Sequence, residues 1–337
     1  MSKRIGSRTV ALPAHPGVLA WASVAGQKEK DGPYGEEFDQ IIENELNGEQ
    51  SFEAAERRML ETAVMLCAGK AGCATGDVQM LLAGDLLNQI ISAGFAARNL
   101  EIPFYGLYGA CSTMSESLSL GGMLADGGFA DRLICATCSH FCTAERQYRM
   151  PVPYGSQRTP TAQWTATAAG CTILSAEGPG PYVTHVTCGK IVDKGITDAN
   201  NMGAAMAPAA YDSLSAFFRD TDTKPDDYDL IITGDLGELG HAIVRDFFAT
   251  DGIQLGENCQ DCGLLLYDRD QQDMHAGASG CGCSASVLNG YLLTEMRRGK
   301  WKKIVFAPTG ALLSPTSSFQ GESVPGICHV VCLSVEK

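Results

Sequence analysis

The residue with the clearest chemical potential is Cys111, which follows a glycine-rich turn and opens a predicted helix. Gly106 and Gly109 precede it, and a run of small residues continues from Ser112 to Gly122. A cysteine at a helix N-terminus lies at the positive end of the helix dipole, which lowers the pKa of its thiol. A helix rich in Ser, Gly and Ala also allows other backbone to approach closely. The pattern therefore predicts a thiol that points into a pocket from the start of a central helix.

A second small-residue turn repeats this composition later in the chain. Cys281 and Cys283 stand in the run Ser279-Gly-Cys-Gly-Cys-Ser, which also leads into a predicted helix. A strand that ends in Gly-Asp precedes each turn, at Asp85 and at Asp235. Two matches in the same order and at similar spacing indicate duplication of the chain. We therefore expect two halves, residues 1–190 and 191–337, whose small-residue turns face one cavity.

The elements that must position these turns alternate between strands and helices. Candidate strands lie at 9–12, 77–85, 133–136, 165–175, 182–188, 228–235, 303–307 and 328–335, and candidate helices at 36–45, 51–67, 86–99, 112–122, 200–219 and 241–249. Residues 143–165 are proline-rich and are expected to be irregular. Such alternation favours right-handed crossovers and a largely parallel sheet. We predict an α/β fold of two pseudo-twofold sheets with the small-residue helices between them.

Composition limits the possible functions. Of 337 residues, 45% are hydrophobic and 19% charged, which is typical of a chain with a large interior. The net charge of −14 argues against nucleic-acid binding and against direct docking to an anionic membrane. No signal-peptide core is apparent, and no apolar run reaches the roughly 18 residues of a spanning helix. The 14 cysteines are expected to be reduced, and any membrane contact to go through partners.

The cysteine motif resembles the thiolase and ketoacyl-synthase superfamily. Gly109-Ala-Cys111-Ser lies where that family carries its acyl-accepting cysteine. The resemblance covers nearly the whole chain and implies a duplicated five-layered α-β-α-β-α sandwich, usually a homodimer. Thiolase-like sporulation proteins of spore-forming bacteria resemble the chain more closely, in Gly-Gly-Phe-Ala-Asp131, Ser139-His140, Tyr154-Gly155 and the Cys281–Cys283 turn.

This closer resemblance implies a ligand and a location. It implies binding of dipicolinic acid (pyridine-2,6-dicarboxylate) and its uptake into the developing spore, together with other stage V sporulation membrane proteins. The protein would then lie peripherally on the cytoplasmic face of the forespore or spore inner membrane. Whether the ligand enters alone or as its calcium chelate stays open, and no cofactor is implied.

Departures from the condensing enzymes indicate a protein without catalysis. Those enzymes need a histidine after the second-half strand and a second His or Asn at the second-half turn, which together stabilise the thioester oxyanion. Here the strand ends in Thr233-Gly234-Asp235, and the turn offers Cys281, Gly282 and Cys283. The carboxylate of Asp235 would oppose an oxyanion. The alternatives are a Cys111-dependent acyltransferase with unusual partners and an interaction scaffold with a vestigial pocket.

A dicarboxylate needs hydrogen-bond donors and cations around it. Helix N-termini favour anions, and Arg binds carboxylates through its bidentate fork. The predicted ligand contacts are Cys111, Ser139, His140, Arg146, Arg149, Thr233, Ser279, Cys281 and Cys283. Competing interpretations remain for several: Cys111 as nucleophile or plain core, His140 as a histidine satisfied by backbone, and Arg146, Arg149 and Arg158 as partners in loop salt bridges.

Two cysteine pairs raise the question of a metal. Cys135 with Cys138 and Cys259 with Cys262 have the spacing of a four-thiolate zinc site. However, the first pair starts in a predicted strand, whose side chains alternate, and a long separation divides the pairs. We predict no metal site. Asp85 and Asp235 are expected to cap their turns.

Overall fold

The computed structural model describes residues 3–148 and 159–337. Its main sheet follows one path of ten strands. In spatial order these are β12 (Cys259–Asp261), β11 (Leu230–Thr233), β14 (Lys303–Ala307), β17 (Val330–Ser334), β10 (Tyr182–Thr187), β3 (Gly17–Ala25), β9 (Ala168–Ser175), β7 (Arg132–Ser139), β5 (Met80–Gly84) and β6 (Phe104–Gly106). Short strands β1 (Arg4–Ile5), β2 (Thr9–Ala11) and β4 (Gln40–Ile41) pair at its margins. The predicted helix over residues 36–45 was wrong, because β4 pairs there with β3.

The path consists of two sets of five strands that meet at one residue pair. Tyr182 of β10 pairs with Gly17 of β3, and this single pair joins the set β12-β11-β14-β17-β10 to the set β3-β9-β7-β5-β6. The expectation of a largely parallel sheet was wrong. Parallel pairing in the two sets is confined to β6-β5-β7 and β12-β11-β14, because β9 and β17 run antiparallel to both of their neighbours.

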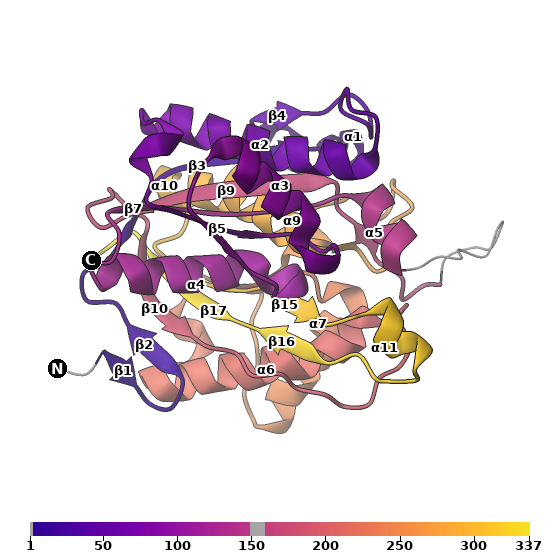
Figure 1. Ribbon diagram of the computed structural model, residues 1–337. Coiled ribbons are helices and arrows are strands. Elements are labelled where there is room, and N and C mark those ends of the chain that lie inside the picture. The colour runs from indigo at the N-terminus through magenta and orange to yellow at the C-terminus, as the bar shows by residue number, and fades with distance from the viewer. Residues whose placement is uncertain (1–2, 149–158) are drawn as a thin grey trace.

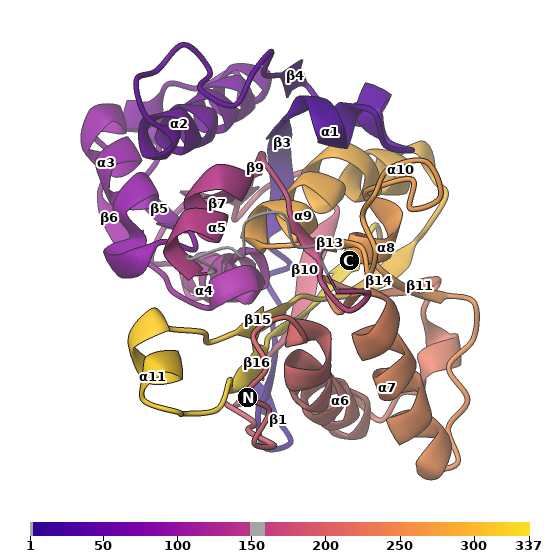
Figure 2. The same cartoon turned by 90° about the vertical axis from the view of Figure 1, so that its right-hand side faces the viewer.

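Helices and sheet alternate in five layers, which confirms the predicted sandwich (Figures 1 and 2). Helices α2 (Phe52–Ala71) and α3 (Ile91–Leu100) cover one outer face. Helices α6 (Met202–Thr221) and α7 (Gly237–Thr250) cover the other. Between the strand sets lie α4 (Thr113–Asp126) and the continuous run α9 (Cys281–Ser286), η6 (Val287–Leu292) and α10 (Leu293–Arg298). Both small-residue helices therefore occupy the central layer.

Shorter elements frame the edges of the layers. They are α1 (Gln27–Lys30), α5 (Phe141–Tyr148), β8 (Trp164–Thr165), α8 (Cys262–Leu265), β13 (Ala278–Ser279), β15 (Thr309–Ala311), α11 (Pro315–Phe319) and β16 (Gly326–Cys328). The prediction of irregular chain from residue 143 was wrong as far as Tyr148, because the prolines that suggested it begin only at Pro151. None of the described helices combines the length and the apolar character needed to span a bilayer.

Local sequence explains where helix α2 begins and how closely helix α9 packs on the sheet. The Ser51 hydroxyl accepts the Ala54 N–H at 3.2 Å and caps α2, as a capping residue should. Helix α9 lies directly on β9: a Cβ at Gly170 would be 2.4 Å from the carbonyl oxygen of Ala285. A Cβ at Gly282 would likewise be 2.5 Å from the Ala168 oxygen. The central layer thus requires glycine on both sides of this contact.

We expect Gly170→Ala to destabilise the protein by roughly 1–3 kcal/mol, because the new methyl group overpacks against backbone that cannot move aside. Gly94→Ala, in helix α3, is the matched control. A Cβ at Gly94 meets nothing within 4 Å, and this substitution should stabilise the helix by about 0.5–1 kcal/mol. Urea unfolding of both variants measures the difference. Equal stabilities would contradict the close contact between α9 and β9.

Candidate functional site

A pocket opens at the N-terminus of α4, around Cys111. It encloses about 430 Å³ of empty space, part of which is open to solvent. Its walls are mostly apolar, with a thiol and four hydroxyl groups. The lining residues are Leu86, Tyr108, Ala110, Cys111, Ala144, Tyr148, Thr165, Met202, Ser279, Ala311 and Leu313. Residues from the first and the second half of the sequence therefore meet at this pocket.

The turn that carries Cys111 is held in a defined shape. Ala110 has φ 48, a left-handed conformation that costs an L-residue on the order of 1 kcal/mol. The Ser112 hydroxyl donates to the Gly109 oxygen at 2.7 Å, and the Thr113 hydroxyl donates to the Ala110 oxygen at 2.7 Å. These bonds fix the turn η4 (Ala110–Ser112) before α4 begins. Cys111 is thereby presented to the pocket from a rigid support, with 5% of its surface exposed.

A buried carboxylate lies directly behind the thiol. Asp235 accepts the Gly280 N–H at 3.0 Å and the Ser279 hydroxyl at 3.3 Å on one oxygen. Its other oxygen accepts the Thr309 hydroxyl at 3.2 Å. Burial raises the pKa of Asp235 to about 7, although hydrogen bonds from the Cys111 thiol and Gly280 act in the other direction. Asp235 therefore titrates near neutral pH.

The Cys111 thiol is held in its protonated form, which corrects the expectation from the helix dipole. Burial raises the pKa of Cys111 well above its usual value, and the nearby carboxylate of Asp235 and the Cys281 thiol raise it further. Desolvation and a like charge here outweigh the dipole of α4. A protonated thiol is a weak nucleophile. Among the described lining residues, none is a histidine or an asparagine that could activate it.

Of the predicted ligand contacts, Cys111 and Ser279 line the pocket. Four others lie behind its wall and bind protein groups. The Ser139 hydroxyl donates to the Ala166 oxygen at 2.7 Å and accepts the Gly282 N–H at 3.0 Å. Cys281 donates to the Cys138 oxygen, Cys283 to the Gly234 oxygen and Thr233 to Asp261. Because these four side chains are small, the two turns pack closely together. The four residues then support the pocket wall from behind.

The structure places His140 away from the described pocket lining, beside α2. Its Nδ1 accepts the Cys142 N–H at 3.1 Å, so the ring proton is on Nε2. Nε2 donates to the Glu45 carbonyl at 2.8 Å. Burial lowers the pKa of His140, which keeps the ring neutral. The interpretation of a backbone-satisfied histidine therefore fits this geometry, and a ligand donor does not.

The predicted cations are likewise not found at the described lining. Arg146 of α5 is half exposed and pairs with Glu53 of α2. Arg149 and Arg158 lie outside the described residues. The polar groups that the sequence reading missed are the hydroxyls of Tyr108, Tyr148 and Thr165. Tyr108 stands three residues before Cys111 in the same motif, which is the one signal that could have identified it.

The side chains of Tyr108 and Tyr148 contact each other on one side of the pocket. Their hydroxyl oxygens lie 3.2 Å apart, and the Tyr108 hydroxyl also lies 3.4 Å from the Leu86 oxygen. Tyr148 ends α5, which comes from a distant part of the sequence, so its approach to Tyr108 depends on the tertiary fold. In this arrangement Tyr108 donates to Leu86 and Tyr148 donates to Tyr108, so a ligand carboxylate would accept from this pair in exchange for one of these bonds.

The two cysteine pairs with zinc-site spacing lie in different parts of the fold. Cys135 and Cys138 lie in β7, whereas Cys259 and Cys262 lie at β12 and α8, at the far edge of the other strand set, so the two pairs do not meet. The described residues bring Glu45, His140 and Cys142 within 4.8 Å of one another. Both ring nitrogens of His140 are already engaged with backbone, so neither offers a free lone pair to a metal.

Comparisons with known proteins agree over most of the chain. The model of the family described as stage V sporulation protein AD matches residues 6–334. A relative named stage V sporulation protein AD, from Bacillus subtilis (strain 168), is 46% identical over 309 residues, which cover 92% of this chain and 91% of the relative.

Solved structures establish the fold class. A 3-oxoacyl-[acyl-carrier-protein] synthase III from Aquifex aeolicus VF5 superimposes with a TM-score of 0.60 at 11% identity, covering 94% of this chain and 99% of that one. Human mitochondrial 3-ketoacyl-CoA thiolase in complex with CoA gives 0.57 at 14% identity, covering 96% and 99%. At such low identity the likeness shows a thiolase-like fold alone.

Asp235 predicts a pH dependence of stability. Its pKa is about 7 in the folded protein and about 3.9 in an unfolded chain, so the folded state binds more protons between these values. The stability contribution is therefore fully present below about pH 4 and is lost as the pH rises towards 7. Asp235→Asn keeps a hydrogen-bond acceptor but carries no charge. We expect the melting temperature of this variant to rise relative to that of wild type as the pH increases from 5 to 8. Parallel melting curves would contradict the assignment.

Proposed function

The chain belongs to the stage V sporulation protein AD family, and from this membership and its pocket we propose that it binds dipicolinic acid for uptake into the developing spore. In this proposal the protein is not an enzyme. The single observation that carries it is the pocket at Cys111, which keeps the thiol of a condensing enzyme but surrounds it with apolar walls, hydroxyls and a buried carboxylate.

The lack of catalysis is supported by the chemistry around the thiol. A condensing enzyme requires a thiolate and two donors for the oxyanion. Here the pKa of Cys111 is raised well above its usual value, and the group behind it is the acid Asp235. An ionised Asp235 repels an oxyanion, and a neutral one offers a single proton in place of two fixed donors. The site therefore suits binding better than acyl transfer.

Binding of an aromatic dicarboxylate is supported by the donors and by the shape of the pocket. The N-termini of α4 and of the α9 run both begin at its wall, and helix N-termini favour anions. The hydroxyls of Tyr108, Tyr148 and Thr165 add donors, and Leu86 and Leu313 offer apolar faces to a ring. Asp235 can accept a proton near neutral pH, which removes its repulsion of the ligand; ionised, it would instead favour the calcium chelate.

Calorimetric titration with dipicolinate, with and without calcium, tests the proposal. We expect saturable binding to wild type and at least a tenfold loss in Cys111→Trp, because the indole fills the pocket. Cys111→Ser is the matched control: it keeps the volume and removes the thiol, so affinity should stay within about threefold. Melting curves check that each variant is folded.

Two outcomes would overturn this proposal. Flat titrations of folded wild type under both conditions remove dipicolinate as the ligand. An acyl adduct on Cys111 after incubation with acyl-CoA, absent in Cys111→Ser, would instead establish the alternative of a Cys111-dependent acyltransferase. That alternative is favoured only by the thiol's position on the pocket wall at the start of α4.

We also propose that the protein forms a homodimer and acts on the cytoplasmic face of the forespore or spore inner membrane with other stage V sporulation membrane proteins. Strand β6 ends the path of strands, and its outer edge has no strand partner among the described residues (Figure 2). Around it, Tyr105 is 61% exposed, Ile91 42% and Phe95 41%. An exposed edge with apolar neighbours is a template for pairing with a second copy.

Tyr105→Asp should convert the dimer to a monomer, because it places a charge at the centre of the proposed contact. Ile253→Asp is the control, since Ile253 is also partly exposed but lies after α7 on the other half. Sedimentation velocity measures both. A monomeric wild type, or an unchanged Tyr105→Asp dimer, would contradict pairing through β6.

A further inference from the structure

A second cavity lies on the side of α4 that faces the start of the chain. It contains about 520 Å³ of empty space, part of it open to solvent. Side chains from β2, α4 and β10 and from the loops at Arg8, Cys188 and His329 line it. These residues are Arg8, Val10, Glu116, Ser119, Leu120, Met123, Val186, Cys188 and His329. None of them lines the pocket at Cys111, so this cavity is a separate feature.

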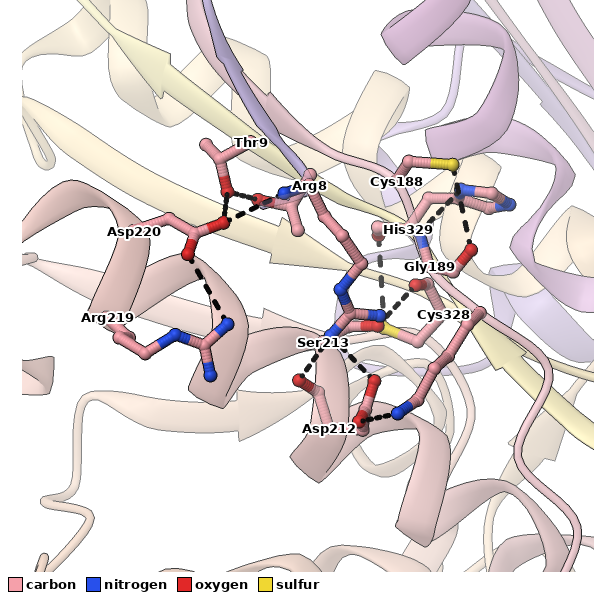
Figure 3. A network of polar contacts seen from close by, with 12 residues as sticks. Arg8, Thr9, Cys188, Gly189, Asp212, Ser213, Arg219, Asp220, Cys328 and His329 are labelled. Atoms are coloured by element: carbon pink, nitrogen blue, oxygen red, sulfur yellow. Dashed lines mark hydrogen bonds and ion pairs between the residues drawn. The ribbon is translucent and has the colours of Figure 1, made fainter. Parts of the chain in front are cut away.

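One wall carries a surplus positive charge. Arg8 reaches Asp212, with Nη2 2.7 Å from the carboxylate and 3.1 Å from the Asp212 carbonyl (Figure 3). Lys190 shares the same carboxylate, at 2.9 Å. Arg8 and Lys190 thus share the carboxylate of Asp212 as an ion-pair partner. The Nη1 of Arg8 is buried and has no hydrogen-bond partner.

A second donor stands on the same side. His329 is 9% exposed, and its Nδ1 accepts the Gly189 N–H at 3.3 Å (Figure 3). Burial lowers the pKa of His329 to about 4, so at neutral pH the ring is uncharged and its proton is on Nε2. No partner of Nε2 is found among the described residues, and His329 is one of the residues that line the cavity.

The helix α4 supplies the opposite charge. Glu116 lines the cavity, and within the described chain no cation pairs with its carboxylate, one oxygen of which is buried without a hydrogen bond. One turn further on, the hydroxyl of Ser119 is also unpartnered, and Ser119 is only 6% exposed. No ion pair joins the Arg8 guanidinium to the Glu116 carboxylate within the described chain, and the apolar side chains of Val10, Leu120, Met123 and Val186 line the same cavity.

We propose that this cavity binds a free α-amino acid with a branched apolar side chain. The ligand carboxylate would accept from Arg8 Nη1 and His329 Nε2, and its ammonium group would donate to Glu116. Its side chain would lie against Leu120, Met123 and the two valines. A zwitterion matches this arrangement because it satisfies both separated charges, which an anion or a cation alone cannot do.

Calorimetry with L-leucine as the probe tests the proposal on the full-length chain. We expect saturable binding to wild type, and at least tenfold weaker binding of 4-methylpentanoate, which lacks the ammonium group, and of 3-methylbutylamine, which lacks the carboxylate. Glu116→Gln should weaken binding of L-leucine at least tenfold and leave binding of 4-methylpentanoate unchanged. Of these two ligands, only L-leucine has an ammonium group that pairs with the Glu116 carboxylate. Arg8→Gln should weaken both acids.

Two controls separate this site from other effects. Arg219→Gln removes a cation from the same polar network, where Arg219 contacts Asp220 away from the cavity lining (Figure 3), and should leave leucine affinity unchanged. Cys111→Trp should leave it unchanged too, because the Cys111 pocket is separate. Flat titrations of folded wild type with L-leucine, or a folded Glu116→Gln that binds it as wild type does, would overturn the proposal.

Discussion

The buried carboxylate of Asp235 is the constraint on which the pocket depends. It joins the start of α9, through Gly280, to Ser279 of β13 and Thr309 of β15, and it lies behind the Cys111 thiol. Three elements of the second half are therefore positioned by one side chain against a cysteine from the first half. Because a buried carboxylate must be hydrogen-bonded or protonated, its position and its protonation are coupled, and both determine the state of the thiol.

Asp85 in the first half of the chain corresponds to Asp235, but a second carboxylate lies close to it. Asp85, which follows β5, accepts the N–H groups of Leu87 and Ala93 at 2.8 and 2.7 Å, and burial raises its pKa to about 6. It lies close to the buried acid Glu56, whose pKa is also raised, first by burial and then by Asp85. Each half thus ends a parallel strand in a buried acid. Asp85 accepts an N–H group at the start of α3, and Asp235 faces the Cys111 thiol.

Features set by residues close together in the sequence could be predicted, and features set by distant residues could not. The Ser51 cap, the turn before Cys111 and the small residues of α9 are local signals, and they located α2, α4 and the central layer. The protonated thiol could not be predicted locally, because its pKa is raised first by burial within the tertiary fold and then by Asp235, which stands more than a hundred residues away in the sequence. The positions of His140 and Arg146 apart from the described pocket lining likewise depend on distant groups: Glu45 and Glu53, which engage them, come from the segment at the start of α2.

Helix α4 relates the two cavities: the turn before it carries Cys111 at the first, and its own side chains line the second. Its first turn follows Cys111, and Glu116 and Ser119, one and two turns further, line the second cavity. Burial raises the pKa of Glu116 to about 6, whereas the N–H of Gly109, in the turn before Cys111, acts in the other direction. The charge on Glu116 is therefore linked to the backbone that presents the thiol. The turn that carries the thiol of the first pocket therefore also lies against one charged group of the second cavity.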